Sequence, residues 1–223
     1  MSIVENINRL KNEIPNEVKL LAVSKTKPLE ELEEAYKAGI RDFGENKVQE
    51  LMAKQEEFHK DVRWHFIGNL QTNKVKYLVG KVYLIHSISS IKLLKQVEKE
   101  FSKRNETANI LIEINIGREE SKGGIFVENL EEMLNEVENC TSVKVRGIMV
   151  IIPKGDTESN RAYFKETKNI FDSLKIRNFN NIHMEVLSMG MTHDYKVAIE
   201  EGSNLVRIGE GIFGVRNYNL GGI

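Results

Sequence analysis

Hydrophobic positions along this chain switch between two spacings, one typical of helices and one typical of buried strands. Residues 3–14 carry Ile3, Ile7, Leu10 and Ile14 on one helical face, which predicts an amphipathic helix at the N-terminus. Residues 20–23 (LLAV) then form a continuous apolar run, the pattern of a strand that is buried on both faces. The pattern therefore predicts a leading helix followed by a buried strand.

The order of strand and then helix repeats along the rest of the chain. Expected strands lie within 19–24, 40–46, 62–68, 81–88, 108–117, 143–152, 183–190 and 204–214, and expected helices within 28–39, 47–59, 73–80, 90–104, 127–139, 158–174 and 194–202. Eight such units, about one per 28 residues, suit a compact (β/α)8 barrel, whose usual length is about 250 residues. A doubly wound open sheet uses the same local alternation, so the spacing alone leaves both architectures open.

No linker rich in Pro, Gly or Ser interrupts the pattern, and the sequence holds three prolines. We therefore expect residues 1–223 to form one α/β domain. The favoured architecture is a single (β/α)8 barrel of the TIM type with an extra N-terminal helix.

The composition is that of a globular protein, with 40% hydrophobic and 29% charged residues. The 32 basic and 33 acidic side chains nearly cancel, so the chain lacks the basic excess typical of nucleic-acid binders. The single cysteine, Cys140, cannot form an internal disulfide, and no apolar stretch is long enough to span a membrane. We expect a cytoplasmic protein without a nucleic-acid or membrane partner.

Polar residues gather where the expected strands end. In a (β/α)8 barrel the carboxyl ends of all strands open onto one face, where active sites are built. Reading these ends in order gives a ring of candidate residues: Lys25, Gly44, Glu45, Asn46, His65, Gly68, His86, Ser87, Asn115, Met149, Ser188, Met189, Gly190, Arg207, Ile208 and Gly209. For His65 and His86 taken singly, a hydrogen-bonded place at the edge of the core is the preferred interpretation.

Lys25 follows the first buried strand after a single intervening residue. Taken alone, a lysine there is expected to extend its amine to solvent; the alternative is that it is kept for chemistry. The last two strand ends, LSMGMTHD (187–194) and RIGEGIFG (207–214), are rich in small residues whose backbone amides can approach a phosphate. A lysine opposite a phosphate cradle is what a pyridoxal 5′-phosphate (PLP) site requires, because the lysine forms an imine with the cofactor aldehyde.

Motifs for other chemistry are absent from the sequence. The segment GREESKGG (117–124) lacks the G-K-[ST] ending of a P-loop, and H-E-x-x-H, C-x-x-C and G-x-S-x-G do not occur. The sequence therefore gives no support to a dedicated metal site.

Together, these segments resemble the pyridoxal phosphate homeostasis protein family, a group of small barrels similar to alanine racemase. The motifs that carry the resemblance run through nearly the whole chain: LLAVSKTKP (20–28), FGENKVQE (43–50), WHFIGNLQTNK (64–74), HSI (86–88), INIGREESKGGI (114–125), GIMVIIP (147–153) and LSMGMTHDYKVAIEEGSNLVRIGEGIFG (187–214). The resemblance implies that PLP is held as an imine on Lys25. It also implies a role in intracellular PLP, vitamin B6 and amino-acid homeostasis without established turnover.

The same resemblance implies a set of cofactor-binding residues. They are Lys25 for the imine, Asn46 beside the ring, Arg207 facing the pyridine nitrogen, and Ser188, Met189, Gly190, Gly209 and Glu210 around the phosphate. An arginine stays charged and only donates hydrogen bonds, so it would keep the ring nitrogen unprotonated and the ring a poor electron sink. That favours a non-catalytic carrier over an enzyme.

Two positions depart from the family pattern. Lys47 stands where an aromatic residue is common after GEN, and Glu210 replaces a small hydroxyl residue after RIG. Because a carboxylate cannot donate to a phosphate, we expect the Glu210 amide to serve while its side chain turns outward. A pairing of that carboxylate with Arg216 or Lys25 is the alternative.

Other functions compete with the carrier. A PLP-dependent amino-acid racemase would need a second acid/base residue from an added domain. We expect no such domain, because nothing remains after FGVRNYNLGGI (213–223) to build one. A class I aldolase also pairs an imine lysine with a barrel phosphate site, but Lys25 on the first strand argues against it. We expect a monomer whose partners are PLP and apoenzymes that use it.

Overall fold

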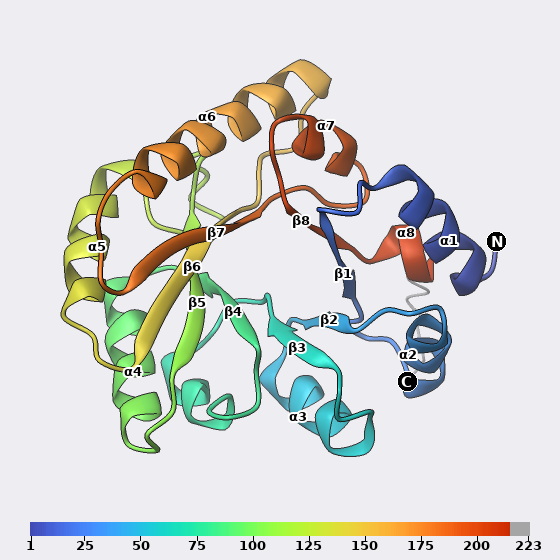
Figure 1. Ribbon diagram of the computed structural model, residues 1–223, viewed down its shortest axis with the longest axis horizontal. Helices are drawn as coiled ribbons and strands as arrows, with labels where there is room; N and C mark the ends of the chain where they lie inside the picture. Colours follow the sequence, from blue (N-terminus) through green and yellow to red (C-terminus); the bar gives the residue numbers. More distant parts are fainter. Residues whose placement is uncertain (215–223) are drawn as a thin grey trace, which may run out of the picture.

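Eight parallel strands form the centre of the computed structural model, which describes residues 1–214. They are β1 (Lys19–Val23), β2 (Asp42–Glu45), β3 (Arg63–Phe66), β4 (Leu84–Ile88), β5 (Ala108–Ile114), β6 (Val143–Val150), β7 (Ile182–Ser188) and β8 (Leu205–Ile208). Each strand pairs with its neighbours in chain order, and the ring closes into a barrel (Figure 1).

The closing pair of strands decides between the two predicted architectures. β1 pairs in parallel with β8, with Lys19 opposite Leu205 and Ala22 opposite Ile208. An open doubly wound sheet would leave its two outer strands unpaired on one side. The prediction of a (β/α)8 barrel is therefore confirmed.

Helices surround the barrel and connect its strands (Figure 1). The α-helices are α1 (Ile3–Glu13), α2 (Leu29–Lys37), α3 (Val48–Glu57), α4 (Ile91–Ser102), α5 (Leu130–Glu138), α6 (Thr157–Lys175), α7 (Tyr195–Glu200) and α8 (Glu210–Phe213), and the 3₁₀ helices are η1 (Thr72–Tyr77) and η2 (Val127–Asn129). The helix expected within 73–80 is therefore the 3₁₀ helix η1. It buries Val75 alone among its six residues, so little packing favours a longer α-helix there.

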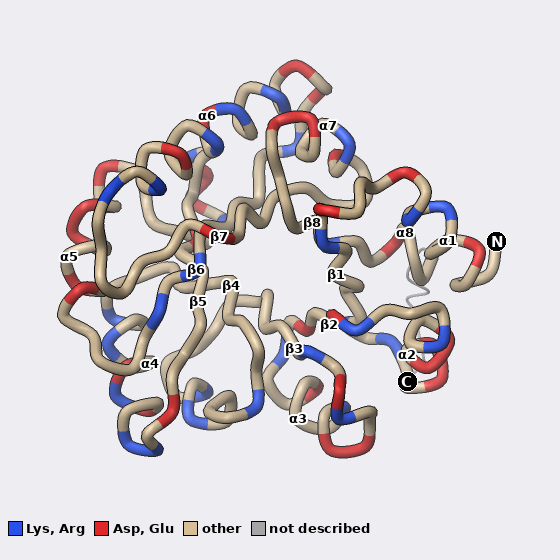
Figure 2. The backbone as a smooth tube through the Cα atoms, viewed as in Figure 1, with Lys and Arg blue, Asp and Glu red and all other residues tan. Residues whose placement is uncertain are grey.

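The hydrophobic core is built from the strands and the helices around them. On α6, which lies at the expected helix 158–174, Phe164, Phe171 and Leu174 are buried. Figure 2 shows that charged residues lie mainly on the helices and loops outside the barrel. Some buried polar residues nevertheless lie on the strands, among them His65, His86 and Arg207.

The leading helix α1 packs against α2 and α8. Ser2 caps it in a reciprocal capping box with Glu5. Asn6 Nδ2 donates to Ile212 O at 3.0 Å, and Lys11 Nζ donates to Ala38 O at 2.8 Å. The first helix thus ties the start of the chain to its last described turn. No helix within residues 1–214 combines the length and the apolar character needed to cross a membrane.

Candidate functional site

Lys25 lies in a tight turn that follows β1. The Ser24 amide donates to Gly44 O at 3.0 Å, and the Lys27 amide donates to Ser24 O at 3.1 Å. Thr26 has a φ of 65°, a region that β-branched residues rarely adopt. The turn therefore fixes the backbone direction at Lys25, whose side chain is partly buried.

A buried polar cluster of Glu45, Glu50 and Lys54 underlies this turn. Lys54 Nζ, on α3, donates to Ser24 O at 2.8 Å. It also donates to Glu45 Oε1 at 2.8 Å and to Glu50 Oε1 at 2.7 Å. Ser24 Oγ donates to Glu45 Oε1 at 2.6 Å, and the Thr26 amide donates to Glu50 Oε1 at 2.5 Å. The cluster thus holds the residues on both sides of Lys25.

The Glu45 carboxyl within this cluster is fully buried. Burial raises its pKa, while the Lys54 ammonium and the hydrogen bonds from Lys54 and Ser24 oppose that rise. Its second oxygen, Oε2, has no hydrogen-bond partner among the described residues. The cluster therefore depends on Lys54 for its charge balance.

The loops after β7 and β8 supply unbonded backbone amides next to β1. A Cβ atom at Gly209 would lie 3.2 Å from Val23 O, so this loop packs directly against the end of β1. At Gly190 the φ is 93°, and a Cβ would lie 2.6 Å from Ala198 Cβ. The amides of Gly190, Gly209 and Glu210 donate to no acceptor within residues 1–214. These amides can receive an anion.

Arg207, on β8, points into the barrel interior beside Ser188. Its Nη1 donates to Ser188 Oγ at 2.6 Å and its Nη2 to Val150 O at 2.8 Å. Its Nε has no acceptor among the described residues. Burial lowers the pKa of Arg207 to about 10, so the guanidinium stays charged at neutral pH. The Nε donor of a buried cation is thus left for a ligand.

Two of the residues expected at the phosphate already have partners in the structure. Ser188 Oγ accepts from Arg207 and lies 3.3 Å from His86 Nδ1. The Met189 amide donates to Leu205 O at 3.2 Å, and the Met189 side chain is buried. Both residues therefore support the barrel interior rather than offering a free donor.

His86 and His65 extend this interior chain of hydrogen bonds. His86 Nε2 lies 2.9 Å from His65 Nδ1, and His65 Nε2 lies 3.0 Å from Asp42 Oδ1. Burial lowers the pKa of both histidines, so both rings are neutral at neutral pH. The preferred interpretation of each as a hydrogen-bonded core histidine is confirmed. Their expected place in the ring at the carboxyl ends is wrong, because both rings lie deeper inside the barrel.

Asn46 and Glu113 bring two more polar groups to buried positions. Asn46 follows β2, and its buried Oδ1 has no hydrogen-bond partner among the described residues. Glu113, on β5, is 8% exposed; burial raises its pKa to about 7, while the charge of Arg207 opposes the rise. Buried polar atoms normally have partners, so the Asn46 oxygen fits a site that a ligand completes.

The two positions that depart from the family pattern both face solvent. Lys47 is exposed. The Glu210 side chain is 48% exposed, and its Oε2 lies 3.8 Å from His193 Nε2. This is the outward direction expected for its carboxylate. Arg216, the suggested alternative partner, lies outside the described residues.

Sequence reasoning missed two residues of this region. Thr192 Oγ1 accepts from the Gly211 amide at 3.3 Å, which places a hydroxyl beside the loop after β8. Its signal was a hydroxyl residue directly after the Ser-Met-Gly-Met run. The sequence analysis gave Lys54 no role, and the available signal was its four-residue spacing from Glu50 on the expected helix 47–59.

Comparison with known proteins identifies the family. The model of the alanine racemase N-terminal domain matches residues 1–217. A pyridoxal phosphate homeostasis protein of Aquifex aeolicus is 47% identical over 91% of this chain and 89% of its own length. The chain belongs to this family. Its relative of the same name in Escherichia coli K12 is 38% identical over 92% of this chain and 88% of that protein.

Solved structures place the family on the same barrel. PipY of Synechococcus elongatus, solved with PLP bound, has a TM-score of 0.88 and 32% identity, covering 96% of this chain and all of that one. An alanine racemase of Clostridium difficile has a TM-score of 0.75 at 14% identity and covers 98% of this chain but 58% of its own. The racemase shares the fold, whereas PipY shares fold and sequence over its full length.

Proposed function

We propose that this chain binds pyridoxal 5′-phosphate at the mouth of the barrel and acts in PLP homeostasis as a non-catalytic carrier. The observation that carries the proposal is the packing of Gly209 against Val23. It brings the unbonded amides of Gly209 and Glu210 to the end of β1, where the turn that presents Lys25 begins, and the unbonded amide of Gly190 lies in the neighbouring loop after β7. The name shared by the relatives and the PLP bound to PipY support the same ligand.

The residues at the mouth divide into groups for each part of the cofactor. Lys25 provides the amine for covalent attachment. The amides of Gly190, Gly209 and Glu210 with the Thr192 hydroxyl would hold the phosphate, because they are the donors near α8. Asn46 would lie beside the ring. Ser188 and Met189 would support these residues from the barrel interior through their own hydrogen bonds.

Arg207 sets the electronic character of the site. PLP supplies an electron sink whose strength depends on a proton at its ring nitrogen. The free Nε of Arg207 can donate to that nitrogen but cannot be expected to protonate it, since the guanidinium stays charged. A carrier needs no strong electron sink, so this arrangement suits binding and release.

The absorption spectrum of the purified protein tests cofactor binding. We expect a visible band that becomes a stable adduct on Lys25 after borohydride reduction, located by peptide mapping. A protein that acquires neither band nor adduct with added PLP would refute the proposal.

Racemase and aldolase activity distinguish the carrier from the alternatives. We expect no racemisation of a panel of L-amino acids above the rate of free PLP, and no cleavage of phosphorylated ketoses. Racemisation that disappears in Lys25→Ala would establish the protein as a racemase. We further propose a cytoplasmic monomer that passes PLP to apoenzymes, to be tested by sedimentation and by transfer assays.

A further inference from the structure

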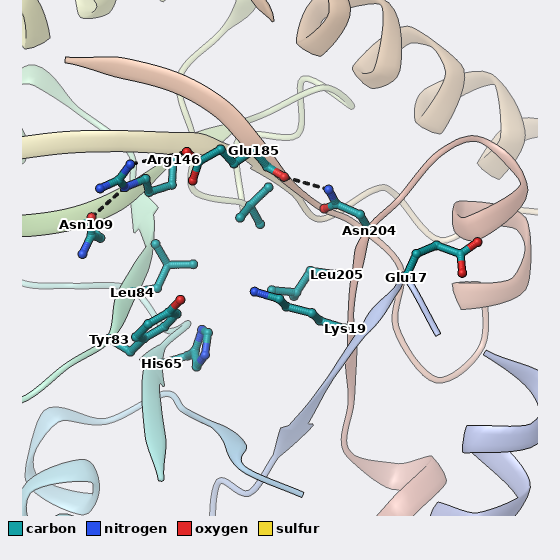
Figure 3. Close-up of a pocket in the computed structure, with 11 residues that line it drawn as sticks. Glu17, Lys19, His65, Tyr83, Leu84, Asn109, Arg146, Glu185, Asn204 and Leu205 are labelled. Atoms are coloured by element: carbon teal, nitrogen blue, oxygen red, sulfur yellow. Dashed lines mark hydrogen bonds and ion pairs between the residues drawn. The ribbon is translucent and has the colours of Figure 1, made fainter. Parts of the chain in front are cut away.

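A cavity of about 380 Å³ opens near the amino ends of the strands (Figure 3). Lys25 follows the carboxyl end of β1, so the cavity lies at the opposite end of the barrel. Lys19, the first residue of β1, and Leu205, the first of β8, both contribute to it. The full lining is Glu17, Lys19, His65, Tyr83, Leu84, Asn109, Arg146, Glu185, Val186, Asn204 and Leu205. Its volume lies at the lower end of the range of small-molecule sites.

Unbonded donors dominate the polar part of this cavity. Figure 3 shows the Lys19 amine pointing inward, toward the side of His65 and Tyr83. Neither the Lys19 amine nor the Tyr83 hydroxyl has a hydrogen-bond or ion-pair partner within residues 1–214. Arg146 Nε donates to Asn109 Oδ1 at 2.7 Å, which leaves the Asn109 amide nitrogen as a further donor.

The side-chain acceptors around the cavity either already have a partner in the protein or point away from the cavity. Glu185 faces Arg146 across 3.5 Å, and Asn204 Oδ1 accepts from the Leu187 amide at 2.8 Å. Glu17 extends away from the other lining side chains (Figure 3). Excess donors, one of them cationic, favour an anion. The apolar walls of Leu84, Val186 and Leu205 favour one with a hydrocarbon part.

His65 connects this cavity to the interior of the barrel. Asp42 also accepts from Arg63, and although burial raises its pKa, the bonds from His65 and Arg63 hold that pKa below its usual range. An ionised Asp42 can only accept, so the neutral His65 carries its proton on Nε2. His65 Nδ1 must then accept, which makes His86 Nε2 a donor.

The hydrogen bonds from His86 to Arg207 also have fixed directions. His86 Nδ1 is left as an acceptor, so the Ser188 hydroxyl donates to it and accepts from Arg207. Every hydrogen bond therefore runs in one direction, from Arg207 through Ser188 and both histidines to Asp42. His65 Nδ1 is the acceptor for His86 Nε2, so a change in the His65 ring also changes the hydrogen bond of His86. The hydrogen bonds of this network therefore depend on one another.

We propose that the cavity binds a small aliphatic carboxylate through Lys19 and that its occupancy is transmitted through His65 to His86. Any effect of the carboxylate on bound PLP, through Arg207, rests on the function proposed above. Binding of the carboxylate and its transmission to His86 do not depend on that function.

Calorimetry on the cofactor-free protein tests the binding, with butyrate and succinate as probes and inorganic phosphate as comparison. We expect saturable binding of a carboxylate that weakens at least tenfold in Lys19→Met, which removes the charge from an exposed side chain. Lys92→Met removes an exposed charge from α4 and should leave binding unchanged. Absence of saturable carboxylate binding, equal affinity in Lys19→Met, or tighter binding of phosphate would overturn the site.

Nitrogen-15 spectra of the histidine rings test the transmission without any cofactor. Carboxylate should shift the ring resonances of both His65 and His86 in the wild type but not in Lys19→Met. The exposed His59, His183 and His193 serve as internal controls. A shift at His65 with none at His86, or equal shifts at the exposed rings, would overturn the transmission. Because neither experiment uses PLP, failure here is distinguishable from failure of cofactor binding.

Discussion

Thr26 occupies a backbone region that costs a β-branched residue about 1–3 kcal/mol. The strain persists because the Thr26 amide is held by Glu50 and the neighbouring Ser24 by Lys54. The residue between them is Lys25. An unfavourable conformation kept beside the lysine proposed for covalent chemistry indicates that the backbone at Lys25 is held in place by its neighbours.

Replacing Lys25 by alanine should abolish the visible band and the borohydride-fixed adduct while the protein remains folded. The amine is removed, but the clamped backbone of the turn stays. Absorption spectra and peptide mapping measure the loss, and circular dichroism measures the fold. Lys47→Ala and Lys122→Ala are the matched controls and should keep the adduct; its loss in either one would place the attachment elsewhere.

Replacing Glu210 by threonine should tighten PLP binding at low salt. A carboxylate near a phosphate dianion is unfavourable, and threonine removes that charge while adding a hydroxyl donor. The exposed side chain of Glu210 is screened by water, so the gain should shrink at high salt. Titration of both proteins at two salt concentrations measures it. Weaker binding by the threonine variant would reveal a positive role for Glu210.

At the scale of elements, hydrophobic spacing was sufficient to predict each strand and nearly every helix. It could not give the depth of a polar side chain inside the barrel. His65 was assigned to the rim, although β3 turns it inward to Asp42 and His86. Ser188 remains a predicted phosphate residue, but its hydrogen bond from Arg207 could not be predicted, because Arg207 lies nineteen residues later in the chain and on the next strand. Such choices depend on which strands become neighbours.

Lys54 carries the positive charge that pairs with Glu45 and Glu50 where α3 contacts the turn after β1. Lys54→Met should lower the free energy of unfolding by roughly 3–5 kcal/mol, because it leaves Glu45 buried without a cation. It should also weaken PLP binding, since the turn loses a hydrogen bond at Ser24. Urea denaturation measures the first effect.

A second substitution separates charge from packing at this contact. Adding Glu45→Gln to Lys54→Met removes the unpaired charge and should restore part of the lost stability. Lys47→Met, an exposed change just before α3, should have no effect on stability. A double variant no more stable than Lys54→Met alone would show that packing of the lysine, not its charge, is what the contact requires.

For the molecule as a whole, Glu113 makes stability depend on pH. Its pKa rises from 4.5 to about 7 on folding, so the folded state holds the proton more tightly. This contribution is fully present below pH 4.5 and is lost as pH rises through about 7. By linkage it amounts to at most about 3 kcal/mol.

Glu113→Gln should remove this pH dependence. Between pH 5 and pH 8 the wild type should lose the stability that protonated Glu113 contributes, whereas the variant should not. The free energy of unfolding of the variant minus that of the wild type should therefore increase over this range. Urea titrations across that range measure the difference, with the exposed Glu132→Gln as control. Parallel curves for the wild type and Glu113→Gln would contradict the assignment.

The pairing of β1 with β8 has a consequence for synthesis of the chain. Lys19 is synthesised long before its partner Leu205, because nearly all of the barrel lies between them in the chain. At roughly 5–20 residues per second, β1 waits on the order of ten seconds or more with one edge unpaired. The proposed cofactor site draws on β1, β7 and β8, so it cannot form on a nascent chain before β8 has left the ribosome. Any capture of the cofactor at this site must therefore follow the emergence of β8.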